Sequence, residues 1–167
     1  MPEGYAETRL GHTPMQVMPD KDYYNKFGNT WGSTEFSAFG KPSSYIPQST
    51  IEGHPEVLRH EAIHAFLGPK QGGVPPEQAA KLIQPNYLSN YYPDQSARAA
   101  EVPARLTTDP SSVGMTVDTG RDAMRQYLEL LRRSNPSLAT RLSRHLGLAG
   151  SEQGDKTDVL QRPNDVF

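Results

Sequence analysis

The sequence predicts an α+β protein in which a small sheet of short strands precedes a set of helices. Residues 34–39 alternate roughly between polar and apolar side chains, which is typical of a strand. Residues 55–67 repeat apolar side chains at helical spacing, and residues 119–133 form a strongly amphipathic helical pattern. With 14 glycines, 15 prolines and only 35% hydrophobic residues, the chain is expected to have a small core and much irregular structure.

The first part of the chain is expected to hold an irregular arm over residues 1–30, followed by short strands. Within this arm, Asp20 is placed to cap a short helix that contains Tyr23 and ends at Gly28. Between residues 31 and 51 the composition turns to Ser, Thr, Tyr, Phe and Gly. This composition favours two or three strands, the last near residues 45–51.

The second part of the chain is expected to be helical apart from its loops and its tail. A loop rich in glycine and proline begins at residue 69. The sequence then predicts helices over residues 76–83, 95–101, 119–133 and 136–146. Asp94 stands where the cap of the second of these helices belongs, and Asn135-Pro136 starts the fourth. We therefore predict one folded domain over residues 31–149, followed by a polar C-terminal tail over residues 150–167.

A well-delimited helix is predicted over residues 55–67. Pro55 suits the first helical position, with Gly53 or His54 as the cap, and Gly68-Pro69 is a strong stop signal. The apolar side chains between these ends form one stripe that faces the core. The polar side chains beside the stripe are therefore held at fixed positions.

This helix contains the spacing His60-Glu61-x-x-His64, which carries the chemistry of the chain. Residues four apart share a helical face, so His60 and His64 can present two imidazoles to one metal ion. Glu61 lies about 100° around the helix from His60. A general base for a metal-activated water belongs at that position. The spacing predicts a metal site with Glu61 as its base.

A catalytic zinc site needs three protein ligands and an open fourth position. The chain has no cysteine, so any zinc must be held by histidine and carboxylate. A third histidine of the extended motif is excluded, because Leu67 and Lys70 stand where its glycine and histidine would be. Glu101 is the preferred third ligand, because small side chains around it would let two helices approach closely: Ala97, Ala100 and Ala104. Three residues remain as alternatives: Asp94, Asp109 and His145.

The His60-Glu61-Ala-Ile-His64 segment, together with Ala-Ala-Glu101-Val-Pro-Ala downstream, resembles the gluzincin branch of the zincin metallopeptidases over about residues 45–106. The resemblance implies a small zincin-like sheet whose edge strand, near residues 45–51, pairs with an extended peptide. It implies that the third zinc ligand is Glu101 on a second helix. It also implies a side chain that stabilises the oxyanion, for which the chain offers three candidates: Tyr87, Tyr91 and Tyr92. On this reading the protein is a zinc-dependent metallopeptidase that acts on a peptide or protein substrate.

Composition and net charge limit the possible binding partners and the expected cellular location of the protein. A net charge of −2 argues against a nucleic-acid partner. No apolar run is long enough for a membrane span, and the N-terminus lacks the pattern of a signal peptide. We therefore expect a cytoplasmic protein or part of a virus particle. The alternative function is a structural or assembly component of a virus particle or toxin complex. Its zincin-like domain would have little or no turnover, and the larger assembly would order the arms.

Overall fold

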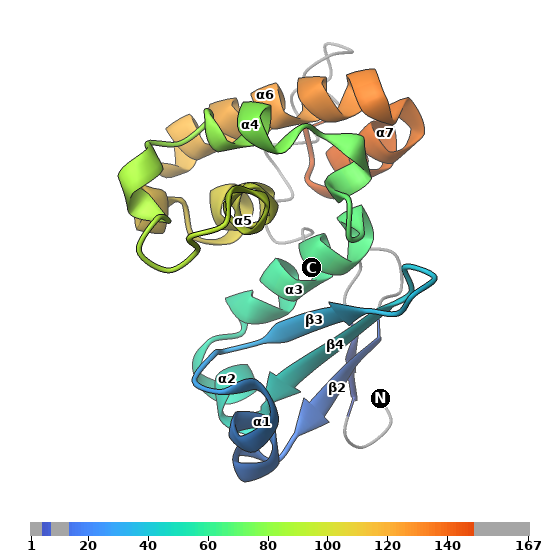
Figure 1. Ribbon diagram of the computed structural model, residues 1–167, viewed down its shortest axis with the longest axis vertical. Helices are drawn as coiled ribbons and strands as arrows, with labels where there is room; N and C mark the ends of the chain where they lie inside the picture. The colour runs from blue at the N-terminus through green and yellow to red at the C-terminus, as the bar shows by residue number, and fades with distance from the viewer. Residues whose placement is uncertain (1–4, 8–13, 149–167) are drawn as a thin grey trace. The chain divides into compact units, whose positions relative to one another are not determined.

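The computed structural model describes residues 5–7 and 14–148, which belong to two compact units, Met1–Pro69 and Lys70–Phe167. All described strands lie in the first unit, together with three helices, whereas the described part of the second unit is helical (Figure 1). The predicted α+β class is confirmed. The predicted tail over residues 150–167 lies outside the described residues.

The sheet of the first unit has the strand order β1-β2-β4-β3. Its strands are β1 (Tyr5–Glu7), β2 (Pro14–Met18), β3 (Ser33–Phe36) and β4 (Pro42–Pro47). The pair β2–β4 is parallel, and the pairs β1–β2 and β3–β4 are antiparallel. Strand β3 therefore lies at an edge of the described sheet, and β4 lies inside it.

The predicted strand near residues 45–51 is only partly right, and its edge position is wrong. Strand β4 ends at Pro47, and the next residues form helix α2 (Gln48–Gly53). Strand β2 pairs with the side of β4 away from β3, with Val17 opposite Ile46. Because β2 comes from the segment predicted as an irregular arm, the sequence pattern gave no indication that β4 would have a neighbour on both sides.

Residues 14–27 of the predicted arm belong to the fold of the first unit. They form β2 and helix α1 (Asp20–Phe27), and the side chains of Met15 and Tyr23 are fully buried. Burial raises the pKa of Tyr23 to about 12, and its hydroxyl is 2.8 Å from that of Thr30. Asp20 is not the cap, because Pro19 holds that position. Its carboxylate instead accepts the amide hydrogen of Ser49, with an oxygen–nitrogen distance of 3.0 Å.

The two faces of the sheet carry different helices. On one face, Phe27 of α1 packs its ring 5.2 Å from that of Tyr45, and Lys26 pairs with Glu35 at 3.7 Å. Side chains alternate between faces along a strand, so Thr34 points to the other face. There Thr34 contacts helix α3 (Glu56–Leu67), which runs along β3 and β4 (Figure 1). The sheet therefore lies between α1 and α3, the helix that carries the histidine motif.

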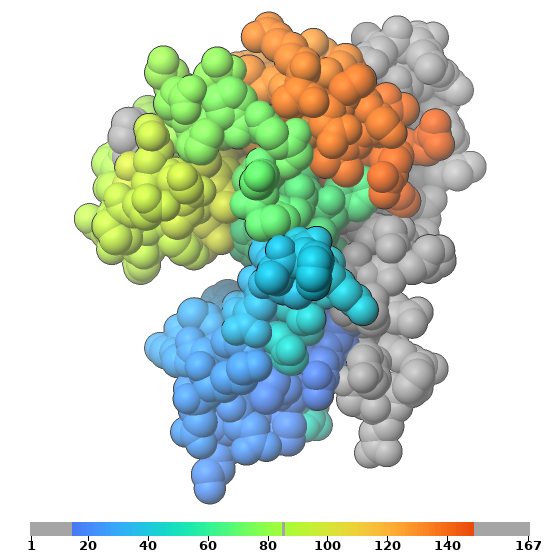
Figure 2. Space-filling view, turned by 45° about the vertical axis from the view of Figure 1, so that its right-hand side comes forward, coloured from blue at the N-terminus to red at the C-terminus, as the bar shows by residue number. Residues whose placement is uncertain are grey.

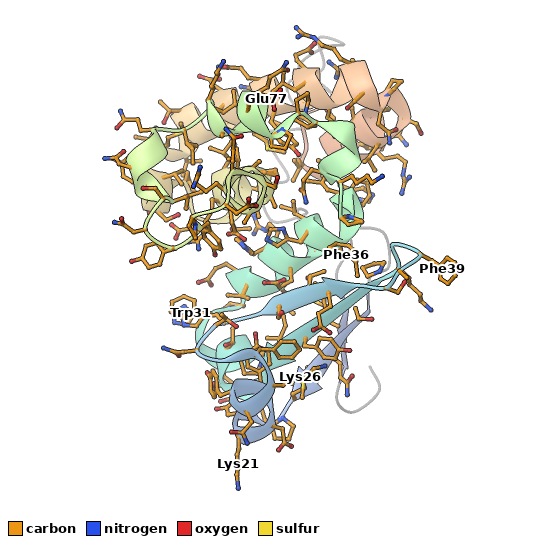
Figure 3. All side chains as sticks on the ribbon, viewed as in Figure 1. Lys21, Lys26, Trp31, Phe36, Phe39 and Glu77 are labelled. Carbon is orange, nitrogen blue, oxygen red and sulfur yellow. The ribbon has the colours of Figure 1, made fainter. Side chains whose placement is uncertain are left out.

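Exposed aromatic side chains lie on both sides of β3 in the sequence. Figure 3 shows Trp31 just before the strand and Phe39 in the turn after it, both directed outward. Trp31 is 52% exposed and stacks on the ring of His54 with a centroid distance of 4.0 Å, whereas Phe39 is fully exposed. The turn that carries Phe39 joins β3 to β4 and lies, in cyan, at the front of the view in Figure 2. Neither residue contributes to the core.

The second unit is built from four α-helices and three short 3-10 helices in its described part. The α-helices are α4 (Pro76–Ala80), α5 (Gln95–Thr108), α6 (Val117–Ser134) and α7 (Pro136–His145). The 3-10 helices are η1 (Gln71–Gly73), η2 (Pro85–Tyr87) and η3 (Pro110–Val113). Helix α5 packs against α4 and α6, and α6 packs against α7. No helix among the described residues is long and apolar enough to cross a membrane.

The predicted cap of α5 is confirmed, and one predicted helix is shorter than expected. The Asp94 side chain accepts the amide hydrogen of Ala97 at 3.0 Å, and that of Asn135 accepts the amide hydrogen of Leu138 at 3.2 Å. Helix α4 ends at Ala80 rather than near residue 83. Pro103 lies inside α5 without ending it, and the helix continues to Thr108.

Replacing the cap of α5 is expected to destabilise the second unit. Asp94→Ala leaves an amide of the first turn without its partner, so we expect a loss of about 1 kcal/mol in the free energy of unfolding. Urea denaturation measures this loss. Ser96→Ala is the control, because Ser96 is exposed in the same turn and is not the cap. Equal losses in both variants would show that the Asp94 bond contributes nothing.

Candidate metal centre

Helix α3 positions the motif because apolar side chains around most of its circumference are buried. Pro55 occupies the cap in place of the predicted Gly53 or His54, and Gly68 ends the helix with a φ of 80°, in the left-handed region that glycine adopts readily. The apolar residues buried along the helix are Val57, Ala62, Ile63, Ala65 and Leu67. With these side chains fixed in the core, His60 and His64 remain half-buried.

The imidazoles of His60 and His64 face each other. Their Nε2 atoms are 3.1 Å apart, and the ring centroids are 4.8 Å apart with an angle of 72° between the planes. Two nitrogens that bind one tetrahedral zinc at about 2.0–2.1 Å lie about 3.3 Å from each other. The observed separation also suits a hydrogen bond when one nitrogen carries a proton. Metal binding therefore requires both Nε2 atoms in their unprotonated form.

Glu61 is buried between α3 and the edge strand. Its side chain is only 5% exposed, and its Oε2 atom accepts a hydrogen bond from the hydroxyl of Thr34 at 2.6 Å. The hydroxyl of Ser44 lies 2.8 Å from that of Thr34. A buried carboxylate that is bonded through one oxygen keeps its other oxygen for a further partner. Glu61 thus combines a fixed position with a remaining acceptor.

Glu101 lies on α5 in the second unit and is 8% exposed. Its Oε2 atom accepts a hydrogen bond from Nε of Arg105 at 3.2 Å, one helical turn further on. Burial raises the pKa of Tyr92, and the nearby Glu101 carboxylate raises it further. Burial opposes the charge on Arg105, but Glu101 and Tyr92 outweigh it and raise the pKa of the guanidinium. Glu101 is therefore a buried carboxylate with a cationic partner beside it.

The alternative third ligands have other local roles. The Asp94 carboxylate caps α5, and that of Asp109 accepts the hydroxyl hydrogen of Ser111 at 2.7 Å. His145 lies in the last turn of α7. Burial lowers the pKa of His145, and the neighbouring Arg141 and Arg144 lower it further. Each alternative lies at a helix terminus, where it has a local role. Glu101, in contrast, is buried in the interior of α5.

The three candidate tyrosines differ in their surroundings. Tyr91 is 78% exposed and Tyr87 is 38% exposed. Tyr92 is half-buried and lies near Glu101 and Arg105, which shift the pKa of its hydroxyl in opposite directions. The geometry therefore relates Tyr92 to the Glu101 carboxylate and gives no such relation for the other two.

Sequence reasoning missed three residues around the candidate site. Thr34 contacts Glu61, Arg105 contacts Glu101, and Ser44 contacts Thr34. The spacing of four between Glu101 and Arg105 was a readable signal for an ion pair on one helical face. The contact between Thr34 and Glu61 was not readable, because it depends on how the sheet packs on α3.

Comparisons of the chain with protein-family models, curated proteins and solved structures found no match. The function is therefore inferred from the residues and their geometry.

Proposed function

We propose that this protein is a zinc-dependent metallopeptidase of the gluzincin type, which hydrolyses peptide bonds. The observation that carries the proposal is the arrangement on α3, where two imidazole nitrogens lie 3.1 Å apart and the adjacent Glu61 carboxylate is buried and held in place. A purely structural zinc site has no use for a carboxylate base beside its ligands. The presence of Glu61 therefore favours hydrolysis over the alternative, a structural or assembly component of a virus particle or toxin complex.

The proposed ligands are His60 and His64 of the first unit and Glu101 of the second, and each of them offers one ligand atom. Two imidazole nitrogens and one carboxylate oxygen are a common protein donor set of catalytic zinc, whereas magnesium and calcium prefer oxygen ligands alone. Arg105 and Tyr92 would act as the outer partners that orient the Glu101 carboxylate. When bound, zinc supplies Lewis acidity that polarises the substrate carbonyl and acidifies a water molecule.

Glu61 performs the proton transfers in the proposed reaction. Its carboxylate accepts a proton from the attacking water and then returns that proton to the amine that leaves. Its burial excludes bulk water from the base, and its fixed position keeps it ready for the transfer. The proposed substrate is therefore a peptide or protein with an accessible amide bond.

The proposal is tested with a peptide library and the purified chain. Chelator-treated protein is expected to cleave no peptide, and one equivalent of zinc is expected to restore cleavage, followed by mass spectrometry of the products. Magnesium in place of zinc is the control and is expected to restore nothing. If the protein binds zinc and cleaves no member of a diverse library, the peptidase proposal is wrong. The assembly role would then be favoured.

A further inference from the structure

The hydroxyl of Thr34 is bonded to one oxygen of the Glu61 carboxylate. The distance from Oγ1 to Oε2 is 2.6 Å, which is typical of a hydrogen bond to a charged acceptor. An ionised carboxylate can only accept, so Thr34 is the donor. The Thr34 oxygen can then accept a hydrogen from Ser44, whose hydroxyl is 2.8 Å away. The hydrogen bonds therefore run in one direction, from Ser44 to Thr34 to Glu61.

The sheet fixes the position of this donor. Thr34 of β3 stands directly opposite Ser44 of β4 in the antiparallel register, so both side chains point to the face that packs on α3. Ser44 is only 3% exposed, although it is polar. Buried hydroxyls are normally hydrogen-bonded, and this one is satisfied by Thr34. The donor to Glu61 is thus held by the strand pairing and by a second buried hydroxyl.

The backbone of Gly32 approaches the other oxygen of Glu61. A Cβ atom on Gly32 would lie 2.8 Å from Oε1, 2.8 Å from Cγ of Glu61 and 2.9 Å from a methyl carbon of Val57. A side chain at this position would have to displace the carboxylate or the segment before β3. Because residue 32 is glycine, its backbone can lie close to Oε1 without a side chain that would displace the carboxylate, while Oε2 is bonded to Thr34.

We propose that Thr34 is a positioning residue for the base, which holds Oε2 so that Oε1 is the oxygen that takes the proton. This inference rests on the proposed peptidase function. A glutamate side chain has several staggered rotamers, and a general base works only in those that bring it within hydrogen-bond reach of the reacting proton. A short bond from a rigid strand selects one of them before substrate arrives.

The first test compares three variants of the zinc-loaded full chain: Thr34→Val, Thr34→Ser and Ser44→Ala. Valine keeps the branched shape and removes the donor, so we expect kcat to fall by about 10-fold or more, as for a lost hydrogen bond to a charged group. The KM and the zinc content should change little, because Thr34 is not a proposed ligand. Serine keeps the donor and is expected to retain most of kcat. Ser44→Ala leaves Thr34 as the donor and should have a smaller effect than valine.

The second test does not depend on activity. Urea unfolding of the metal-free chain is measured for Thr34→Val, for Glu61→Ala and for the double variant. We expect Thr34→Val to destabilise the chain more in the presence of Glu61 than in the Glu61→Ala variant. In the first case a buried carboxylate loses its hydrogen-bond donor, whereas in the second there is no carboxylate to lose one. Additive effects would show that the two side chains are not coupled, and this result would overturn the inference.

The kinetic outcomes separate the inference from the proposed function. If the wild-type chain cleaves peptides and Thr34→Val has an unchanged kcat, the positioning role is wrong while the peptidase proposal stands. A serine variant as slow as the valine variant would also overturn it, since the hydroxyl would then not be the cause. If the zinc-loaded wild-type chain is inactive, both proposals are overturned together.

Discussion

The substitution Glu61→Gln is expected to lower kcat by about 10²–10⁴-fold, the usual cost of losing a general base. Glutamine fills nearly the same volume and can still accept the hydrogen bond from Thr34 through its carbonyl oxygen. It cannot take a proton from water at neutral pH. The fold and the zinc content should therefore be retained while hydrolysis is lost, as measured by peptide cleavage and by metal analysis of the same sample.

Glu56→Gln is the matched control for this experiment. Glu56 lies in the first turn of the same helix, where its carboxylate is 3.1 Å from Nδ1 of the exposed His54. We expect its substitution to leave kcat nearly unchanged. If Glu61→Gln retains full activity, or if both variants lose it equally, Glu61 is not the base.

Removal of either motif histidine is expected to release the metal. His60→Ala or His64→Ala leaves only two of the three proposed ligands, so the zinc affinity should fall by more than about 100-fold, beyond the cost of removing an outer-shell partner. Competition with a chromophoric chelator measures the change in affinity.

His54→Ala is the control for the histidine variants. His54 is a histidine of the same unit, and its ring stacks on Trp31 rather than on a motif residue. We expect the His54 variant to bind zinc as the wild-type chain does. Full zinc occupancy in both motif variants would contradict the proposed site.

The helices were predictable because their signals are local. The stop at Gly68 and the cap by Asp94 each depend on residues within one turn, and the structure has them where the sequence indicated. The imidazole pair was predictable for the same reason, since the spacing of four on a helix brings His60 and His64 together.

The sheet was less predictable because its pairings join distant residues. Strand β2 lies in a segment whose composition indicated an irregular arm, yet its Met15 is fully buried, and Gln16 stands opposite Tyr45 in the parallel register. The contact of Thr34 with Glu61 joins residues 27 positions apart through the packing of β3 on α3. A spacing rule within one element cannot reveal such a contact.

The coordination of bound zinc tests the central claim most directly. We expect X-ray absorption spectroscopy at the zinc edge to show four nitrogen or oxygen ligands at about 2.0–2.2 Å. Two of them should give the multiple-scattering pattern of imidazole, from His60 and His64, and the other two should be a carboxylate oxygen and water. A spectrum with no imidazole or only one, or a chain that holds no stoichiometric zinc, would contradict the proposal that this protein is a zinc-dependent metallopeptidase.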